Sequence, residues 1–177
     1  MTADSKTRKT TQEVRDLLKQ VQDPELPGIS IVDLGMVREV CVAGHGSVRV
    51  DITPTYSGCP ALKLIEDQVL AVLAAGGFSN VVMNTVFSPA WTTDWLSDDA
   101  AAKLRTMGIA PPGPVPAERP QRNPLLRLRV LPADEPVPCP WCGSSSTALR
   151  SRFGATACKA LHYCDGCQQP FEHFKPL

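Results

Sequence analysis

Apolar residues in the first hundred positions follow helical spacing in some segments and strand spacing in others. Helical spacing predicts a first helix that runs from a cap at Thr11 to about Gln20. Residues 36–42 and 48–53 instead favour strands, because apolar and polar side chains alternate in the second of them. The glycine-containing turn between the two strands predicts a β-hairpin.

The same spacing argument extends to the end of this region. A second helix is predicted to begin at Pro60 and to end at a glycine pair, and a third strand follows over 80–87. A last helix is expected from a cap at Ser97 or Asp98 to about Met107. The order α-β-β-α-β-α predicts a small α+β domain with a three-stranded sheet.

Prolines and cysteines divide the chain at the same place. Ten of the 17 prolines lie between residues 111 and 140, and such a segment sustains neither a helix nor a central strand. Two cysteines precede this segment and five follow it or lie at its end. We therefore expect a domain over residues 1–109, an extended proline-rich linker over 110–136 and a β module over 137–177.

The charge balance excludes some partners. The chain has 18 basic and 18 acidic residues, but residues 21–109 carry five basic and ten acidic side chains. No global field favours nucleic acid or an anionic membrane, and the basic footprint of the C-terminal module is weak. The absence of a long apolar run and of a secretory signal predicts a cytoplasmic location with reduced cysteines. Metal ligands or reactive thiols are then expected rather than disulfides.

The strongest motif lies in the C-terminal module. Two Cys-x-x-Cys pairs are separated by 21 residues, just beyond the usual window of about 15–20, and a hairpin of that length brings the two knuckles together at one ion. Four thiolates suit structural zinc, and a module of about 40 residues needs such a metal in order to fold. A redox iron site and two unlinked reduced pairs are the alternatives. The predicted ligands are Cys139, Cys142, Cys164 and Cys167.

Three further residues near this motif have plainer interpretations. Cys158 lacks a paired cysteine two residues away, so we expect a buried or spectator thiol. His162 and His173 are interpreted as surface or packing residues, because four cysteines already complete a tetrahedral site.

A second candidate site surrounds Cys59, which lies between a predicted strand and a predicted helix. Pro60 suits the first helical position, which would make Cys59 the N-cap and lower its pKa through the helix dipole. Such a thiolate could bind a soft metal, receive sulfur or a cluster, or attack an electrophile. A small buried cap without chemistry is the alternative. A cysteine-histidine catalytic set is weakly supported, because His45 is the one histidine in this module.

Several other residues of this module are candidates beside Cys59. Asp23, Glu25 and Asp33 could steer a metal or partner, although turn and cap carboxylates are the plainer interpretation. The tryptophan pair in SPAWTTDW is expected to pack in the core or to form a partner surface. Cys41 lies in an apolar strand and is expected in the core.

These segments together resemble a known family. DPELPGISIVDLG, YSGCPA, SPAWTTDW and GIAPP, followed by CPWCGS, FGATACKALHYC and CDGCQQPFEHFK, are similar to the PaaD family of phenylacetyl-CoA 1,2-epoxidase accessory subunits. The resemblance extends from about Val14 to Lys175. It implies that the first module is a metal–sulfur cluster assembly domain of the SufT-like type and that the second is a zinc ribbon.

The resemblance also implies a function. It identifies Cys59 as a reactive thiol for cluster or metal handling, with Asp33 in the same pattern. The expected role is maturation of a metal centre of the epoxidase system, above all the iron–sulfur cluster of its reductase subunit, with transient iron or a transient cluster. A homodimer that shares a cluster is a further expectation. A non-catalytic subunit that stabilises the oxygenase complex is the alternative, and a thiol enzyme stays open.

Overall fold

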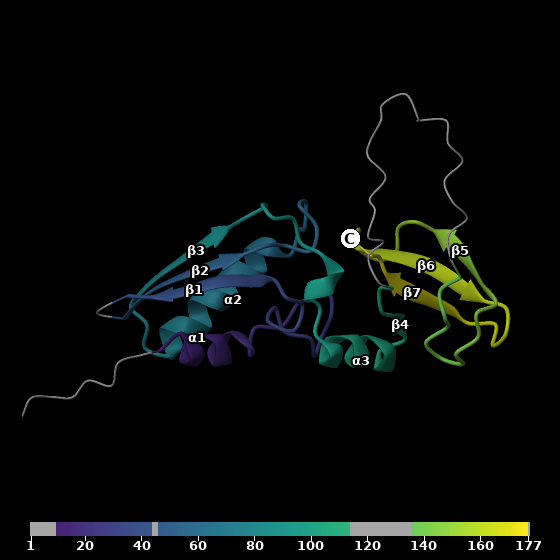
Figure 1. Cartoon of the computed structure of the whole chain (residues 1–177), viewed down its shortest axis with the longest axis horizontal. Coiled ribbons are helices and arrows are strands. Elements are labelled where there is room, and N and C mark those ends of the chain that lie inside the picture. The colour runs from purple at the N-terminus through teal and green to yellow at the C-terminus, as the bar shows by residue number, and fades with distance from the viewer. Residues whose placement is uncertain (1–9, 44–45, 114–135, 177) are drawn as a thin grey trace, which may run out of the picture. The chain divides into compact units, whose positions relative to one another are not determined.

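The computed structural model describes residues 10–43, 46–113 and 136–176. Packing divides the chain into two compact units, Met1–Trp91 and Thr92–Leu177, each with its own sheet. Figure 1 shows the elements of both. The mixture of helices and sheets confirms the α+β class. No helix among the described residues is long and apolar enough to cross a bilayer.

The described part of the first unit contains a three-stranded sheet and two helices. Helix α1 (Thr11–Leu18) begins after a capping box in which Thr10, rather than Thr11, is the cap. The hairpin of β1 (Val37–Val42) and β2 (Ser47–Ile52) is antiparallel, as predicted, although its turn includes residues 44 and 45, which lie outside the described part.

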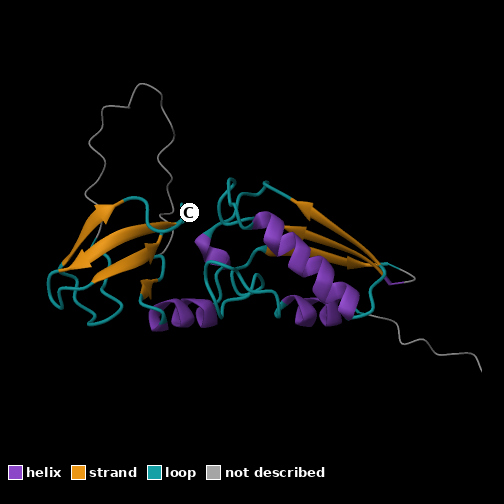
Figure 2. Ribbon diagram, turned by 180° about the vertical axis from the view of Figure 1, so that it is seen from behind, coloured by secondary structure: helices purple, strands orange, loops and turns teal. Residues whose placement is uncertain are grey.

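A helical crossover connects the second strand of this sheet to the third. Helix α2 (Leu62–Ala75) connects β2 to β3 (Asn80–Thr85), and the two strands are parallel, as such a crossover requires. The strand order is β1-β2-β3. Figure 2 shows α2 lying across one face of the sheet. The core between this face and the helices consists mainly of aliphatic side chains: Val14, Leu18, Val50, Ile52, Ile65, Val69 and Leu73.

The second unit begins before the proline-rich segment. It contains a short 3-10 helix (Thr93–Trp95), helix α3 (Asp98–Thr106) and the two-residue strand β4 (Ile109–Ala110). Ser97 caps α3, as predicted, by accepting a hydrogen bond from the backbone of Ala100 at 3.1 Å.

Three antiparallel strands complete the second sheet. They are β5 (Thr147–Ser151), β6 (Lys159–Cys164) and β7 (Pro170–Phe174), and the order is β4-β7-β6-β5. Strand β4 pairs in parallel with β7, which joins residues on both sides of the proline-rich segment. The boundary between the two units therefore lies at residues 91 and 92 and not at the expected residue 109. The reason is that β4 precedes the prolines in the sequence but pairs with β7 after them.

One glycine shows how closely α3 and the first cysteine pair are packed within this unit. Gly108 ends α3 with a φ of +75°, a conformation that L side chains rarely adopt. A Cβ atom built there would overlap the ring of Trp141. The indole of Trp141, between Cys139 and Cys142, therefore rests directly on the backbone that ends α3.

Candidate functional site

The structure brings the four predicted metal ligands together. The sulfur atoms of Cys139, Cys142, Cys164 and Cys167 all lie within 4.8 Å of one another. The Cys139–Cys167 and Cys142–Cys164 sulfurs are 3.7 and 3.6 Å apart. Zn–S bonds of about 2.3 Å in a tetrahedron place sulfurs about 3.8 Å apart, so the donor set fits one zinc ion.

Turns in the backbone aim these sulfurs at one point. The N–H of Gly143 donates to the carbonyl of Cys139 at 2.9 Å, and Gly143 has a φ of +73°. Cys164 ends β6, and its N–H donates to the carbonyl of Gln169 at 3.0 Å, which closes the second turn. Gln168 has a positive φ of 57° without being glycine. Each knuckle is therefore closed by its own backbone hydrogen bond.

The four thiols differ in exposure and acidity. Cys139 and Cys164 are buried, Cys167 is half-buried and Cys142 is exposed. A backbone hydrogen bond from Cys167 lowers the pKa of Cys164 to about 7, whereas burial raises the pKa of Cys167 to about 12. A dication would hold the group as thiolates, because metal binding displaces the protons.

The histidines pack beside the metal ligands and are not among them. His162 and His173 are both buried, with ring centroids 5.3 Å apart, and His162 stacks on Phe171 at 5.5 Å. Burial lowers the pKa of His173 to about 4. The packing interpretation of both is confirmed, whereas a surface position is excluded. Cys158 is half-buried, with its sulfur 3.0 Å from the Thr156 hydroxyl, and lies outside the group of four.

Cys59 lies in the loop between β2 and α2, but not at the expected helix cap. The helix begins at Leu62 and its N-cap is Ala61, so the N-cap prediction for Cys59 is wrong. A turn precedes the helix, in which the N–H of Cys59 donates to the carbonyl of Tyr56 at 3.0 Å and that of Leu62 to the carbonyl of Cys59 at 3.3 Å. The residues that were predicted to occupy the first helical positions therefore belong to this turn.

The thiol of Cys59 is half-buried in an exposed segment. Tyr56, Ser57, Gly58 and Pro60 are all exposed, and the side chain of Tyr56 is 45% exposed. A half-buried thiol on an exposed loop can reach a partner molecule while part of its surface is shielded from water. The arrangement suits a ligand that is handed from one protein to another.

The Asp33 turn and the Cys59 loop meet the same end of the sheet. Residues 30–36 lead directly into β1, and the loop leaves β2 where Ile52 pairs with Val37. The N–H of Thr53 donates to the carbonyl of Met36 at 2.8 Å, which ties the two segments together. Asp33 itself is fixed within its own turn, since its N–H donates to the hydroxyl of Ser30 at 3.1 Å.

Trp91 closes this end of the sheet from a third segment. Its indole N–H donates to the carbonyl of Leu34 at 2.9 Å, and the side chain is buried. The expectation of core packing is therefore confirmed for Trp91, whereas Trp95 is half-buried. Asp23 is a turn carboxylate, because its Oδ1 accepts hydrogen bonds from the N–H groups of Glu25 and Leu26 at 2.8 and 3.1 Å.

Sequence reasoning missed one polar group here. Thr53 alternates with the apolar residues of β2, which predicts an exposed side chain, yet it is 2% exposed and lies just past the end of the strand. Its hydroxyl has no hydrogen-bond partner among the described residues. Buried hydroxyls are usually paired, so this one is an exception, and it lies at the base of the Cys59 loop.

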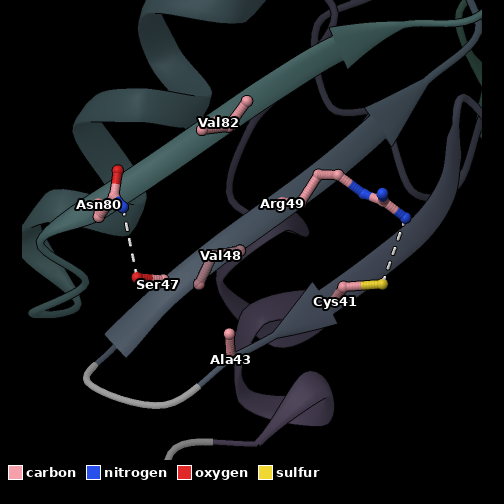
Figure 3. Close-up of a pocket in the computed structure, with 7 residues that line it drawn as sticks. All are labelled: Cys41, Ala43, Ser47, Val48, Arg49, Asn80 and Val82. Atoms are coloured by element: carbon pink, nitrogen blue, oxygen red, sulfur yellow. Dashed lines mark hydrogen bonds between the residues drawn. The ribbon is translucent and has the colours of Figure 1, made fainter.

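Cys41 lies elsewhere, and its expected place in the core is wrong. Its side chain is exposed on the face of the sheet opposite the helices, with the sulfur 3.5 Å from the Arg49 guanidinium. Both residues line, together with Val82, a shallow depression of about 250 Å³ whose lining residues Figure 3 shows. The apolar run around Cys41 hides the strand alternation, because a bulge interrupts β1 between Val37 and Glu39.

Fold and sites together define a protein with an iron–sulfur cluster assembly unit and a four-cysteine β ribbon. Residues 11–82 match the model of the iron–sulfur cluster assembly protein family, and residues 128–175 match the PaaD zinc beta ribbon domain. The chain is 44% identical to an Escherichia coli protein named as a putative 1,2-phenylacetyl-CoA epoxidase subunit, over 92% of this chain and 91% of that one. The chain therefore belongs to the PaaD family.

Relatives of the first unit support the same class. The chain is 47% identical to the Fe-S protein maturation auxiliary factor SufT of Staphylococcus aureus, over 48% of this chain and 96% of that one. A crystal structure of a DUF59 domain from Bacillus anthracis is similar over 53% of this chain and 90% of that one, with a TM-score of 0.51 and 30% identity. These similarities support a role in iron–sulfur assembly, and the relatives' names are those of maturation factors rather than of catalysts.

Proposed function

We propose that this chain is an accessory protein of the phenylacetyl-CoA epoxidase system that matures a metal centre, above all the iron–sulfur cluster of the reductase component. The half-buried thiol of Cys59, on an exposed loop at the end of a rigid sheet, is the observation that carries the proposal. Names of relatives support the system and the type of cargo.

Cys59 would hold the cargo by one bond. A single thiolate leaves the other positions of an iron atom open to ligands from a client, so transfer can proceed by ligand exchange. The Fe–S bond to Cys59 breaks as a bond to a client cysteine forms, and the proton of the client thiol passes to the Cys59 thiolate. The oxidation states of iron and sulfur do not change in this step.

Neighbouring residues would position the thiol without binding iron themselves. The Met36–Thr53 hydrogen bond anchors the loop to the sheet, and the Asp33 turn is fixed by the Ser30 hydroxyl. Asp33 adds a negative charge at this end of the sheet, which favours a cationic iron species.

The four-cysteine group would have a separate, structural role. Zinc held by Cys139, Cys142, Cys164 and Cys167 would supply folding free energy to the second unit. A closed four-thiolate site leaves no open position for chemistry. If the zinc is structural, the chemistry of the protein would take place in the first unit.

Analysis of iron, sulfide and zinc in anaerobically purified protein tests both assignments. We expect the wild-type chain, after exposure to a cluster donor, to bind iron and sulfide beyond its zinc, and to load the purified apo-reductase with its cluster. Cys59→Ala is expected to lose both abilities and to retain zinc. Cys41→Ala is the matched control, because Cys41 is a more exposed thiol of the same unit and should behave as wild type.

Loading of the reductase by Cys59→Ala at the wild-type rate would refute the thiol role. If zinc removal then abolished association with the oxygenase, the stabilising-subunit alternative would account for the result. Asp33→Asn separates charge from turn geometry, since the backbone N–H of residue 33 still donates to the Ser30 hydroxyl and the amide oxygen of Asn can still accept from the Ser30 N–H. We expect slower loading with unchanged thermal stability.

A further inference from the structure

The two edges of the first sheet differ in how they are protected against pairing. At one edge, β1 carries a bulge between Val37 and Glu39, and the side chain of Glu39 is exposed. Bulges and charges are the usual devices that keep an edge strand from pairing with another chain. At the other edge, β3 has neither device in Asn80–Thr85.

Strand β3 is regular and uncharged, and it is an edge strand among the described residues of its sheet. All six of its residues pair with β2 in one continuous register, and none of its side chains is fully buried. No other described strand pairs with its outer side, which Figure 1 shows at the margin of the sheet. The sequence has no charged residue between Asp67 and Asp94, and Val82 is 49% exposed at the centre of the strand.

From this contrast we infer that β3 pairs with β3 of a second copy of the chain, in antiparallel orientation, to make one continuous six-stranded sheet. The inference goes beyond the proposed function and does not depend on it. A two-fold axis perpendicular to the sheet keeps each face on its own side, so paired residues must share a face. This condition restricts the register to one that is centred on a residue.

Centring the axis on Val82 gives a self-complementary edge. Val82 then lies opposite its own copy, Asn80 opposite Asn84, and Val81 opposite Met83. Apolar side chains meet apolar ones and amides meet amides, and no like charges are brought together. Figure 3 shows Val82 and Asn80 on the open face of the sheet. Centring on Met83 would instead place Val82 opposite Asn84.

The pairing makes a prediction about the thiols. The Cys59 loop follows the end of β2 and therefore lies at the C-terminal end of β3 as well, because these strands are parallel. Antiparallel β3 strands then place the two Cys59 loops at opposite ends of the shared strand pair. Six residues span about 20 Å. The dimer therefore holds two separate thiol sites, not the shared cluster that a homodimer suggested from sequence.

Sedimentation velocity over a range of protein concentrations tests the pairing. The area available to one strand edge corresponds to a small, concentration-dependent interface. We expect wild type to dimerise and Val82→Lys to raise the dissociation constant at least about tenfold, because two ammonium groups would meet at the axis. Leu64→Lys is the matched control, since Leu64 on α2 is 48% exposed, and it should leave dimerisation unchanged.

Three further measurements test the pairing at the axis, the register and the fold. Mixing Val82→Lys with Val82→Asp should restore dimers that neither forms alone. Mild oxidation by oxidised glutathione should link Val82→Cys chains in a Cys41→Ser background, whereas Asn84→Cys chains should stay unlinked. Circular dichroism checks that each variant is folded. A wild-type chain that stays monomeric at every concentration, or Val82→Lys that dimerises like wild type, overturns the inference, and Cys59→Ala should dimerise normally.

Discussion

Gly108 gives the sharpest test of how the second unit is held together. Gly108→Ala combines two costs: a residue with a side chain in the left-handed region, which costs about 1–2 kcal/mol, and a methyl group inside the ring of Trp141. The ring of Trp141 is 55% exposed and can move toward solvent, so displacing it adds only about 1 kcal/mol. The sum predicts that the free energy of unfolding of this unit falls by about 2–3 kcal/mol.

Gly143→Ala provides the matched control in the same unit. Gly143 has nearly the same φ, +73° against +75°, but a Cβ there would meet nothing within 4 Å. It therefore incurs the backbone cost without the ring. Urea unfolding of the zinc-loaded chain is followed by circular dichroism, with zinc content measured in parallel. The free energy of unfolding should be lower for Gly108→Ala than for Gly143→Ala.

A double-mutant cycle isolates the ring contact. Trp141→Ala alone should cost about 1 kcal/mol, because the ring is 55% exposed, whereas in the Gly108→Ala background, where the ring is already displaced, it should cost nothing further. Equal destabilisation by the two glycine substitutions, or additive effects of Gly108→Ala and Trp141→Ala, would refute the reasoning that the indole rests on the end of α3.

Three further predictions concern the second unit. Lys159 is 5% exposed, and its ammonium nitrogen lies 2.8 Å from the carboxylate of Glu172. Lys159→Met alone should lower the free energy of unfolding by about 3–5 kcal/mol, because it leaves the Glu172 charge without its partner, and adding Glu172→Leu should reduce this loss. Thermal unfolding of the two variants measures the difference. Burial lowers the pKa of His173 to about 4 in the folded state, so between about pH 4 and 6.5 the unfolded state binds one proton that the folded state does not. The free energy of unfolding therefore falls as the pH drops from about 6.5 to about 4. His173→Leu should flatten this part of the curve of stability against pH. Chelation of zinc should remove the circular-dichroism signal of the ribbon while leaving that of the first unit, and an unchanged ribbon signal would contradict a structural metal.

Much of the chain before the proline-rich segment could be predicted from local patterns. The helix and strand order, the hairpin, the glycine stop after α2 and the Ser97 cap all depend on residues close in sequence. The start of α2 could not be placed, because a turn with two backbone hydrogen bonds takes up Cys59 and the residues after it. The exposure of Cys41 depends on a bulge, which no periodicity reveals.

The candidate sites show the same division. Doubled Cys-x-x-Cys spacing was enough to group four sulfurs, since each knuckle is local and one hairpin joins them. The buried hydroxyl of Thr53 and the ion pair of Lys159 with Glu172 depend on contacts between segments, so no motif announces them. The clearest signal for Lys159 would have been its place in an otherwise apolar strand, KALHYC.

The pairing of β4 with β7 changes what the proline-rich segment connects. Both of its ends belong to the same compact unit, so it is an insertion within the second unit and not a linker between the two units. The two units are joined at residues 91 and 92. Loop-closure cost grows slowly with length, so insertions there should be tolerated. A truncated protein that begins after the prolines would lack a strand of its own sheet, whereas one that begins at Thr92 would carry the whole unit.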